Sequence, residues 1–160
     1  MSNSLLKVPT YALLACFLFG LTTVAKADDS VKKRLDERGI KHAIDADGDF
    51  KVTYNYTKEK RTQLVFVSGK TEIVRDRNIR EIFSPTANIK TSDIDGTKAL
   101  KLMSESRKNK LGSWEIEGDM LYFVIKLPEI LSSTDLEIAM DIAAETADDM
   151  ELELTGKDEF

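Results

Sequence analysis

The chain has one cysteine, one histidine and no glycine-rich phosphate loop, and each scarcity excludes a class of chemistry. The cysteine is Cys16, inside an apolar N-terminal run, so the rest of the chain can form neither an internal disulfide nor a thiolate zinc site. A hydrolytic triad needs a general base, and the only histidine, His42, is accompanied by no Gly-x-Ser-x-Gly motif. The sequence therefore predicts a protein that is not an enzyme and needs no cofactor.

Basic residues are outnumbered by acidic ones, which bears on the partners of the protein. The chain has 23 Lys and Arg against 28 Asp and Glu, and residues 1–27 contain Lys7 and Lys26 but no acid. The remaining chain has 21 basic and 28 acidic side chains, a formal charge of −7. A domain this acidic repels phosphate backbones. We expect no nucleic acid partner, and we interpret the short basic stretches 58–61, 75–80 and 107–110 as solvated surface.

Three alternating aspartates, Asp45, Asp47 and Asp49, resemble the start of a calcium-binding loop. An EF-hand loop needs glycine at its sixth position and a bidentate glutamate at its twelfth. Here the sixth position is Phe50 and the twelfth is Tyr56. A hairpin turn at the Asp-Gly pair explains the spacing better. We predict no metal site, and whether these carboxylates bind a cation stays open.

The N-terminus has the three parts of a Sec signal peptide over residues 1–27. A polar start carries Lys7, an apolar run extends from Tyr11 to Leu21, and small residues end the segment at Ala25-Lys26-Ala27. The apolar run is shorter than the roughly 20 residues that span a bilayer. We therefore expect cleavage after Ala27, a periplasmic location and no stable membrane insertion.

Cys16 ends the segment Leu-Leu-Ala-Cys, which resembles a lipoprotein acylation box. Acylated lipoproteins usually continue with a polar tether. Here Cys16 is followed by Phe-Leu-Phe-Gly-Leu. The composition of this segment therefore disfavours lipid anchoring at Cys16.

Hydrophobic periodicity predicts one α+β domain over residues 28–155 and a frayed acidic tail over 156–160. Helices are expected at 30–38, 93–110 and 134–154, and strands at 50–56, 64–67, within 78–89, at 113–117 and at 120–127. The elements follow the order α-β-β-β-α-β-β-α and form a mostly antiparallel five-stranded sheet. Pro85 confines the third strand to an edge or a bulge. Ala99, Leu100 and Met103 form the predicted apolar stripe of the second helix.

The clearest local signal is Gly118-Asp119, a two-residue hairpin turn between the last two strands. It predicts that Glu117 faces Met120, since the turn fixes the register. The opposed pairs then continue as Ile116 with Leu121, Glu115 with Tyr122, and Trp114 with Phe123. Tyr122 and Val124 fall on the sheet face opposite to the large apolar side chains.

Three segments resemble the YbjN family: Ile-Asp-Ala-Asp-Gly-Asp-Phe at 44–50, Gly-Ser-Trp-Glu at 112–115, and the alanine-rich last helix with Ala147-Asp148. The likeness covers nearly all of the chain after residue 27. It implies a role as a regulator of bacterial sensory transduction and a fold like that of type III secretion chaperones, small dimeric proteins that hold extended client segments. Those chaperones are cytosolic, so a role in loading a secretion machine does not carry over to an exported chain.

Apolar side chains outside the predicted core mark a candidate interface. The last helix is predicted to begin at a capping box of Thr134 and Glu137, and its core stripe leaves Ile138 and Ile142 on the far side. Together with Tyr122 and Val124 they are candidate contacts for a protein or peptide client or for a second copy in a homodimer. The favoured function is a non-enzymatic interaction module of the cell envelope. A periplasmic protein that binds a small ligand or a cation is the alternative.

Overall fold

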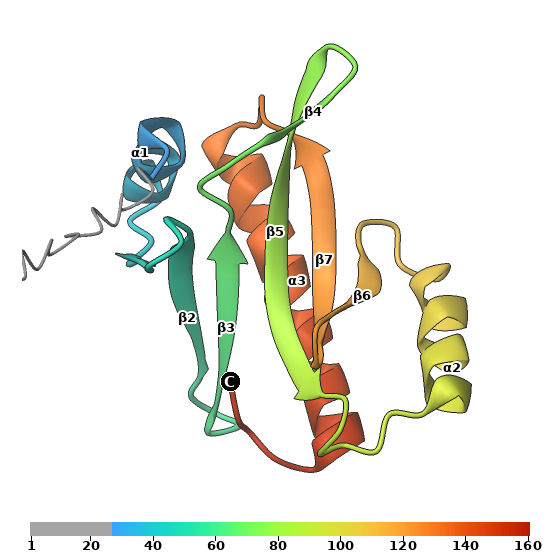
Figure 1. Cartoon of the computed structure of the whole chain (residues 1–160). Helices are drawn as coiled ribbons and strands as arrows, with labels where there is room; N and C mark the ends of the chain where they lie inside the picture. The colour runs from blue at the N-terminus through green and yellow to red at the C-terminus, as the bar shows by residue number, and fades with distance from the viewer. Residues whose placement is uncertain (1–26) are drawn as a thin grey trace, which may run out of the picture.

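The computed structural model describes residues 27–160, which form one sheet with helices on one of its faces (Figure 1). The predicted signal peptide and Cys16 lie outside the described residues, except for Ala27. The helices are α1 (Asp29–Glu37), α2 (Gly96–Ser106) and α3 (Ser133–Thr155). The strands are β1 (Ala43–Ile44), β2 (Phe50–Tyr56), β3 (Arg61–Val67), β4 (Glu72–Val74), β5 (Arg77–Asn88), β6 (Ser113–Glu117) and β7 (Met120–Pro128).

The sheet has the order β1-β2-β3-β5-β7-β6, and β4 pairs with β5 outside this path. Every described pair is antiparallel. The α+β class and the antiparallel sheet are confirmed, but the predicted number of five strands is wrong. The two additional strands, β1 and β4, are two and three residues long, and every residue in them is exposed. Such strands have no alternation of buried and exposed side chains that a sequence pattern could reveal.

β5 lies between β3 and β7, so the third predicted strand is central rather than at an edge. The register of β5 against β7 shifts between Pro85 and Ala87, which marks a β-bulge. Pro85 itself stays opposite Tyr122, so the residue left outside the ladder is Thr86, and the irregularity follows the proline directly. The β6–β7 register predicted from Gly118-Asp119 is confirmed at every pair.

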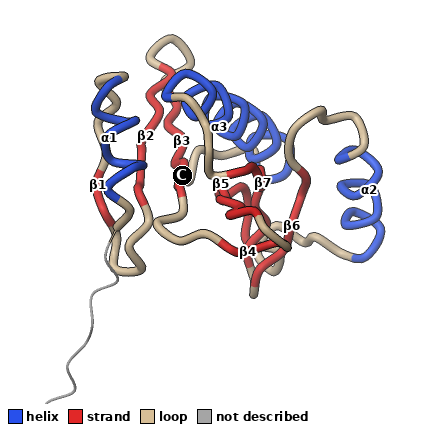
Figure 2. Tube along the Cα trace, turned by 90° about the horizontal axis from the view of Figure 1, so that it is seen from above, coloured by secondary structure: helices blue, strands red, loops and turns tan. Residues whose placement is uncertain are grey.

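α3 packs on β3, β5 and β7, while α1 lies near β1 and β2 and α2 lies beyond β6 (Figure 2). Small side chains allow α3 to approach the sheet closely, because Ala139, Ala143, Ala144 and Ala147 are all buried. No helix of the described chain covers the opposite face of the sheet. α3 begins after Ser132, whose hydroxyl accepts the N–H of Asp135 at 3.0 Å, so the capping box predicted at Thr134 is wrong.

The apolar stripe predicted for α2 is wrong. Leu100 and Met103 are each 67% exposed, and Leu102 is the buried residue of this helix. α2 lies at the end of the sheet rather than on its face (Figure 2), so it buries a narrower line of side chains than a helix that lies flat. It also ends at Ser106 rather than at Lys110.

Gly69 holds the turn after β3 against the turn before β2. A Cβ at this position would overlap the carbonyl oxygen of Gly48. We expect Gly69→Ala to separate the two backbones and to lower the free energy of unfolding by about 2 kcal/mol, a cost typical of overpacking. Gly96→Ala is the matched control, because a Cβ there has no atom within 4 Å. Urea unfolding checks both variants, and equal stability of the two would contradict the close approach.

Candidate functional site

The outer edge of β2 is largely unpaired. β1 covers only the first two residues of β2, and no other described strand pairs with this edge. Outward-pointing backbone groups recur at every second residue of an edge strand. The carbonyl of Asp49 accepts the N–H of Asp45 on this side, so Thr53 and Asn55 share the same outward orientation. Their N–H and C=O groups face no partner strand, and only the Asn55 amide reaches the Thr53 carbonyl, at 3.4 Å.

The opposite edge of the sheet, at β6, is protected by α2. The backbone N–H of Trp114 donates to the hydroxyl of Ser106, the last residue of α2, at 3.0 Å. That hydroxyl in turn donates to the Leu102 carbonyl at 3.0 Å, which fixes its position. An incoming strand would have to displace this contact. α2 therefore covers the β6 edge at Trp114, whereas Thr53 and Asn55 on the β2 edge are exposed.

Two tyrosines of β2 lie beside a row of carboxylates on α3. The Tyr54 hydroxyl donates to Asp141 Oδ1 at 2.8 Å. Burial raises the pKa of the Tyr54 hydroxyl, and the hydrogen bond to Asp141 and the charge of that carboxylate raise it further. Burial, followed by the charges of Asp148 and Glu145, raises the pKa of Tyr56 to about 12. The hydrogen bond from Tyr54 to Asp141 thus joins β2 to the carboxylate-bearing side of α3.

The four predicted interface residues lie on two separate surfaces. Ile138 is 48% exposed and lies one turn before Asp141, on the side of α3 that faces Tyr54. Ile142 is partly buried against the core. Tyr122 and Val124 lie on the uncovered face of the sheet instead. We define the β2 edge surface as the unpaired edge together with the α3 residues beside it: Thr53, Tyr54, Asn55, Tyr56, Ile138, Asp141 and Glu145.

The uncovered sheet face carries an aromatic cluster around Tyr122. Phe66 and Phe83 stack with ring centroids 5.2 Å apart, and Phe83 meets Tyr122 edge-on at 5.8 Å. Val124 is buried among these neighbours. Sequence reasoning missed Phe66, because the run from Leu64 to Val67 is apolar throughout and does not distinguish two faces. It also missed Phe83, which the pairing of β3 with β5 places opposite Phe66.

The residues considered for catalysis or cation binding serve local structure. His42 Nδ1 lies 3.0 Å from the Ile40 carbonyl oxygen, and its ring lies 5.6 Å from that of Phe50. Asp45 Oδ1 accepts the N–H groups of Asp47 and Asp49 at 3.0 and 2.9 Å. In the part of the chain that the structure describes, no group of three or more His, Cys, Asp or Glu side chains could hold a metal ion.

Comparison with known protein families, with curated proteins and with solved structures finds no match for this chain. None of the three described helices is both long and apolar enough to cross a membrane. The inference of function therefore depends on the geometry of this chain's own residues.

Proposed function

We propose that the protein is a non-enzymatic interaction module of the cell envelope, a sensory transduction regulator or chaperone-like factor that binds an extended client segment. The segment would add a strand to β2. The observation that carries this proposal is the unpaired edge at Thr53 and Asn55, because a sheet edge supplies main-chain hydrogen bonds to any extended peptide. The resemblance to the YbjN family and to type III secretion chaperones supports the same function.

The chemistry of the β2 edge surface defines the client. Side chains of an added strand alternate between the two sheet faces, so every second one would lie beside Tyr54 and Tyr56, facing α3. There it would meet the exposed Ile138 and the carboxylates of Asp141 and Glu145. Neither carboxylate has a basic partner among the described residues. A segment that presents apolar and Lys or Arg side chains on one face is therefore the expected client.

A peptide-binding experiment tests this proposal. The probe is a fluorescent peptide of about ten residues in which Val alternates with Lys or Arg, and fluorescence anisotropy measures its affinity. Thr53→Pro removes an outward N–H without breaking a bond to β3, because proline is tolerated on edge strands. We expect it to weaken binding about tenfold, the effect of losing one or two hydrogen bonds. Thr53→Val, which keeps the N–H, is the matched control.

The outcomes separate the parts of the proposal. An unchanged thermal midpoint shows that Thr53→Pro keeps the fold. Equal affinity of Thr53→Pro and Thr53→Val would contradict strand addition at β2, as would the absence of binding by the unmodified protein. A matched peptide with Glu in place of the basic residues should bind more weakly. Equal binding of this peptide would contradict recognition by Asp141 and Glu145.

A further inference from the structure

α2 exposes large apolar side chains, unlike a helix that packs flat on a sheet. Leu100 and Met103 are each 67% exposed, whereas Leu102, about 200 degrees from Leu100 around the helix axis, is buried. Arg107 follows Met103 by four residues and is exposed on the same side. The helix lies at the β6 end of the sheet, and no other helix or strand of the described chain lies beyond it (Figure 1 and Figure 2). The outer face of α2, defined by Leu100, Met103 and Arg107, is therefore open to a partner.

Basic side chains are concentrated in this helix and just after it. Residues 96–111 contain five basic side chains and one acid, a formal charge of +4 within a domain of −7, so the remainder of the domain carries −11. Lys101 is neutralised, because its ammonium lies 3.0 Å from a carboxylate oxygen of Glu153. Arg107 and Lys110 are exposed and make no ion pair with any described residue. The outer face of α2 thus ends in positive charge that the described chain does not neutralise.

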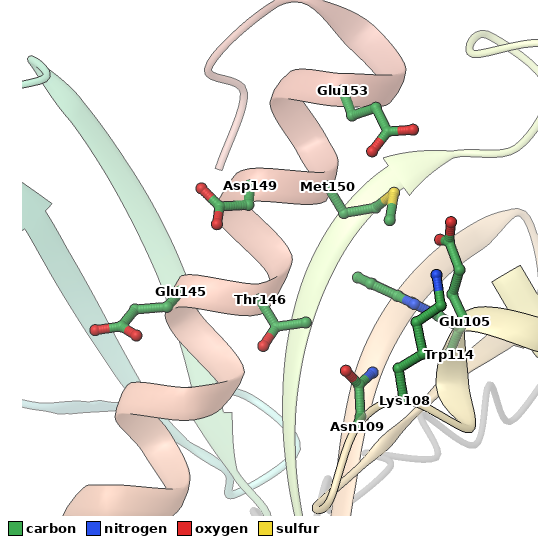
Figure 3. Close-up of a pocket in the computed structure, with 9 residues that line it drawn as sticks. All are labelled: Glu105, Lys108, Asn109, Trp114, Glu145, Thr146, Asp149, Met150 and Glu153. Atoms are coloured by element: carbon green, nitrogen blue, oxygen red, sulfur yellow. The ribbon is translucent and has the colours of Figure 1, made fainter.

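The side of α2 that faces α3 is acidic instead. A pocket of about 420 Å³ lies there, and four carboxylates line it together with a single lysine, Lys108 (Figure 3). The carboxylates belong to Glu105, Glu145, Asp149 and Glu153. Neither this pocket nor the smaller one beside it is lined by Leu100 or Met103. An anion is therefore repelled on the α3 side of the helix and attracted to the end of its outer face, which borders neither pocket.

We propose that the outer face of α2 docks on the surface of an anionic phospholipid membrane. Helices that lie on membranes combine apolar side chains, which enter the headgroup region, with Lys or Arg side chains that pair with lipid phosphates. Leu100 and Met103 supply the apolar contact, and Arg107 and Lys110 supply the contact to phosphates. A flat bilayer matches the convex surface of a helix, whereas an acidic peptide would need a groove to bury both apolar side chains.

This surface is separate from the β2 edge surface. α2 lies beside β6 at one end of the sheet, and β2 lies near the other end. Membrane docking therefore goes beyond the proposed binding of a client. Because the client peptide is measured without vesicles, failure of either proposal is distinguishable from failure of the other.

Co-sedimentation with vesicles tests the proposal. The protein used begins at Asp28, because the apolar run of the predicted signal peptide would bind vesicles by itself. The buried apolar core is kept, since it lies between Val31 and Ala147. The probes are vesicles of phosphatidylglycerol and phosphatidylcholine in equal parts, and vesicles of phosphatidylcholine alone. We expect the protein to bind the anionic vesicles, less strongly as salt is added, and not to bind the neutral ones.

Two variants and two matched controls locate the contact. Leu100→Ser combined with Met103→Ser should weaken binding to anionic vesicles about tenfold or more, because it removes the apolar contact. Arg107→Gln should weaken it about fivefold, the effect of one basic side chain at an anionic surface. Ile130→Ser and Arg77→Gln change an exposed apolar and an exposed basic side chain outside α2, and should leave binding unchanged. An unchanged thermal midpoint shows that each variant keeps the fold.

Each other outcome overturns the proposal. Equal binding to neutral and anionic vesicles would show that charge is not recognised. Vesicle binding that the Leu100 and Met103 double variant leaves unchanged would place the contact elsewhere, as would an equal loss in the two controls. The absence of vesicle binding would exclude the membrane as the partner. In that case a dimer in light scattering that the double variant splits would identify a second copy of the chain as the partner instead.

Discussion

Arg80→Met is expected to lower the free energy of unfolding by about 3 kcal/mol, the low end of the cost of breaking a buried ion pair from one side. Arg80 is 1% exposed, and its guanidinium pairs with Asp28 and with Glu129, the latter at 3.0 Å. It also donates to the carbonyl of Ser68. These contacts join the N-terminal cap of α1, the turn after β3 and the end of β7. Methionine fills similar volume but supplies none of the hydrogen bonds.

The low end of the range applies because Asp28 and Glu129 are partly exposed and can turn toward water when the guanidinium is removed. For a chain of this size, a loss of about 3 kcal/mol corresponds to a decrease in thermal midpoint of about 10 °C. Arg77→Met is the matched control on the same strand, since Arg77 is exposed and lies 3.7 Å from Asp76 alone. Its effect should stay within about 0.5 kcal/mol. Equal midpoints for the two variants would show that the Arg80 cluster does not stabilise the fold.

The role of Arg80 could not be predicted from the sequence, which places it in a basic stretch interpreted as solvated surface. That interpretation is wrong for Arg80. Its partners Asp28 and Glu129 lie 52 and 49 residues away along the chain. Local periodicity contains no information on such contacts. Arg61, in another of these stretches, is likewise drawn inward by Asp148, which lies 2.7 Å away on α3.

The elements that were predicted correctly are those whose signal is local. The two-residue turn at Gly118-Asp119 fixes the β6–β7 register without any tertiary information. The prediction of the apolar stripe of α2 was wrong for the opposite reason. The buried side of a short helix depends on where that helix packs, and local sequence does not contain this information. The candidate site likewise has one part that could be predicted from the sequence and one part that could not. Strand alternation places Tyr54 and Tyr56 on one face, but the unpaired edge beside them results from the shortness of β1.

Glu151 is the second residue from which we expect a large effect, and it depends on pH. Its side chain is 1% exposed near the end of α3, and its Oε1 accepts the N–H of Glu159 at 2.5 Å. The tail over 156–160, predicted to fray, thus contacts α3, and Asp158 also accepts the Thr62 N–H at 3.1 Å. Burial raises the pKa of Glu151 to about 7. The Glu159 N–H opposes this shift, whereas the charges of Asp158, Asp148 and Glu159 add to it.

The sign of the pH dependence follows from the proton balance. The usual pKa of this carboxyl is 4.5, so between pH 4.5 and 7 the folded state holds a proton that the unfolded state has released. Stability from Glu151 is therefore complete below pH 4.5 and is lost as pH rises through 7. Between pH 5 and 8 the unmodified protein should lose about 2 kcal/mol from this group. The pKa of Asp148 is also raised, chiefly by burial, so it contributes in the same direction.

Glu151→Gln keeps the hydrogen-bond acceptor for Glu159 but removes the ionisable group. We expect this variant to be more stable than the unmodified protein at pH 8 and to lose less stability between pH 5 and 8, the remaining loss coming from Asp148. Urea unfolding at pH 5, 6, 7 and 8 measures both quantities. Glu153→Gln, at an exposed position on the same helix, should keep the pH dependence of the unmodified protein. If Glu151→Gln keeps it too, the carboxyl of Glu151 is ionised in the folded protein across this range, and the tail binds a charged rather than a neutral partner.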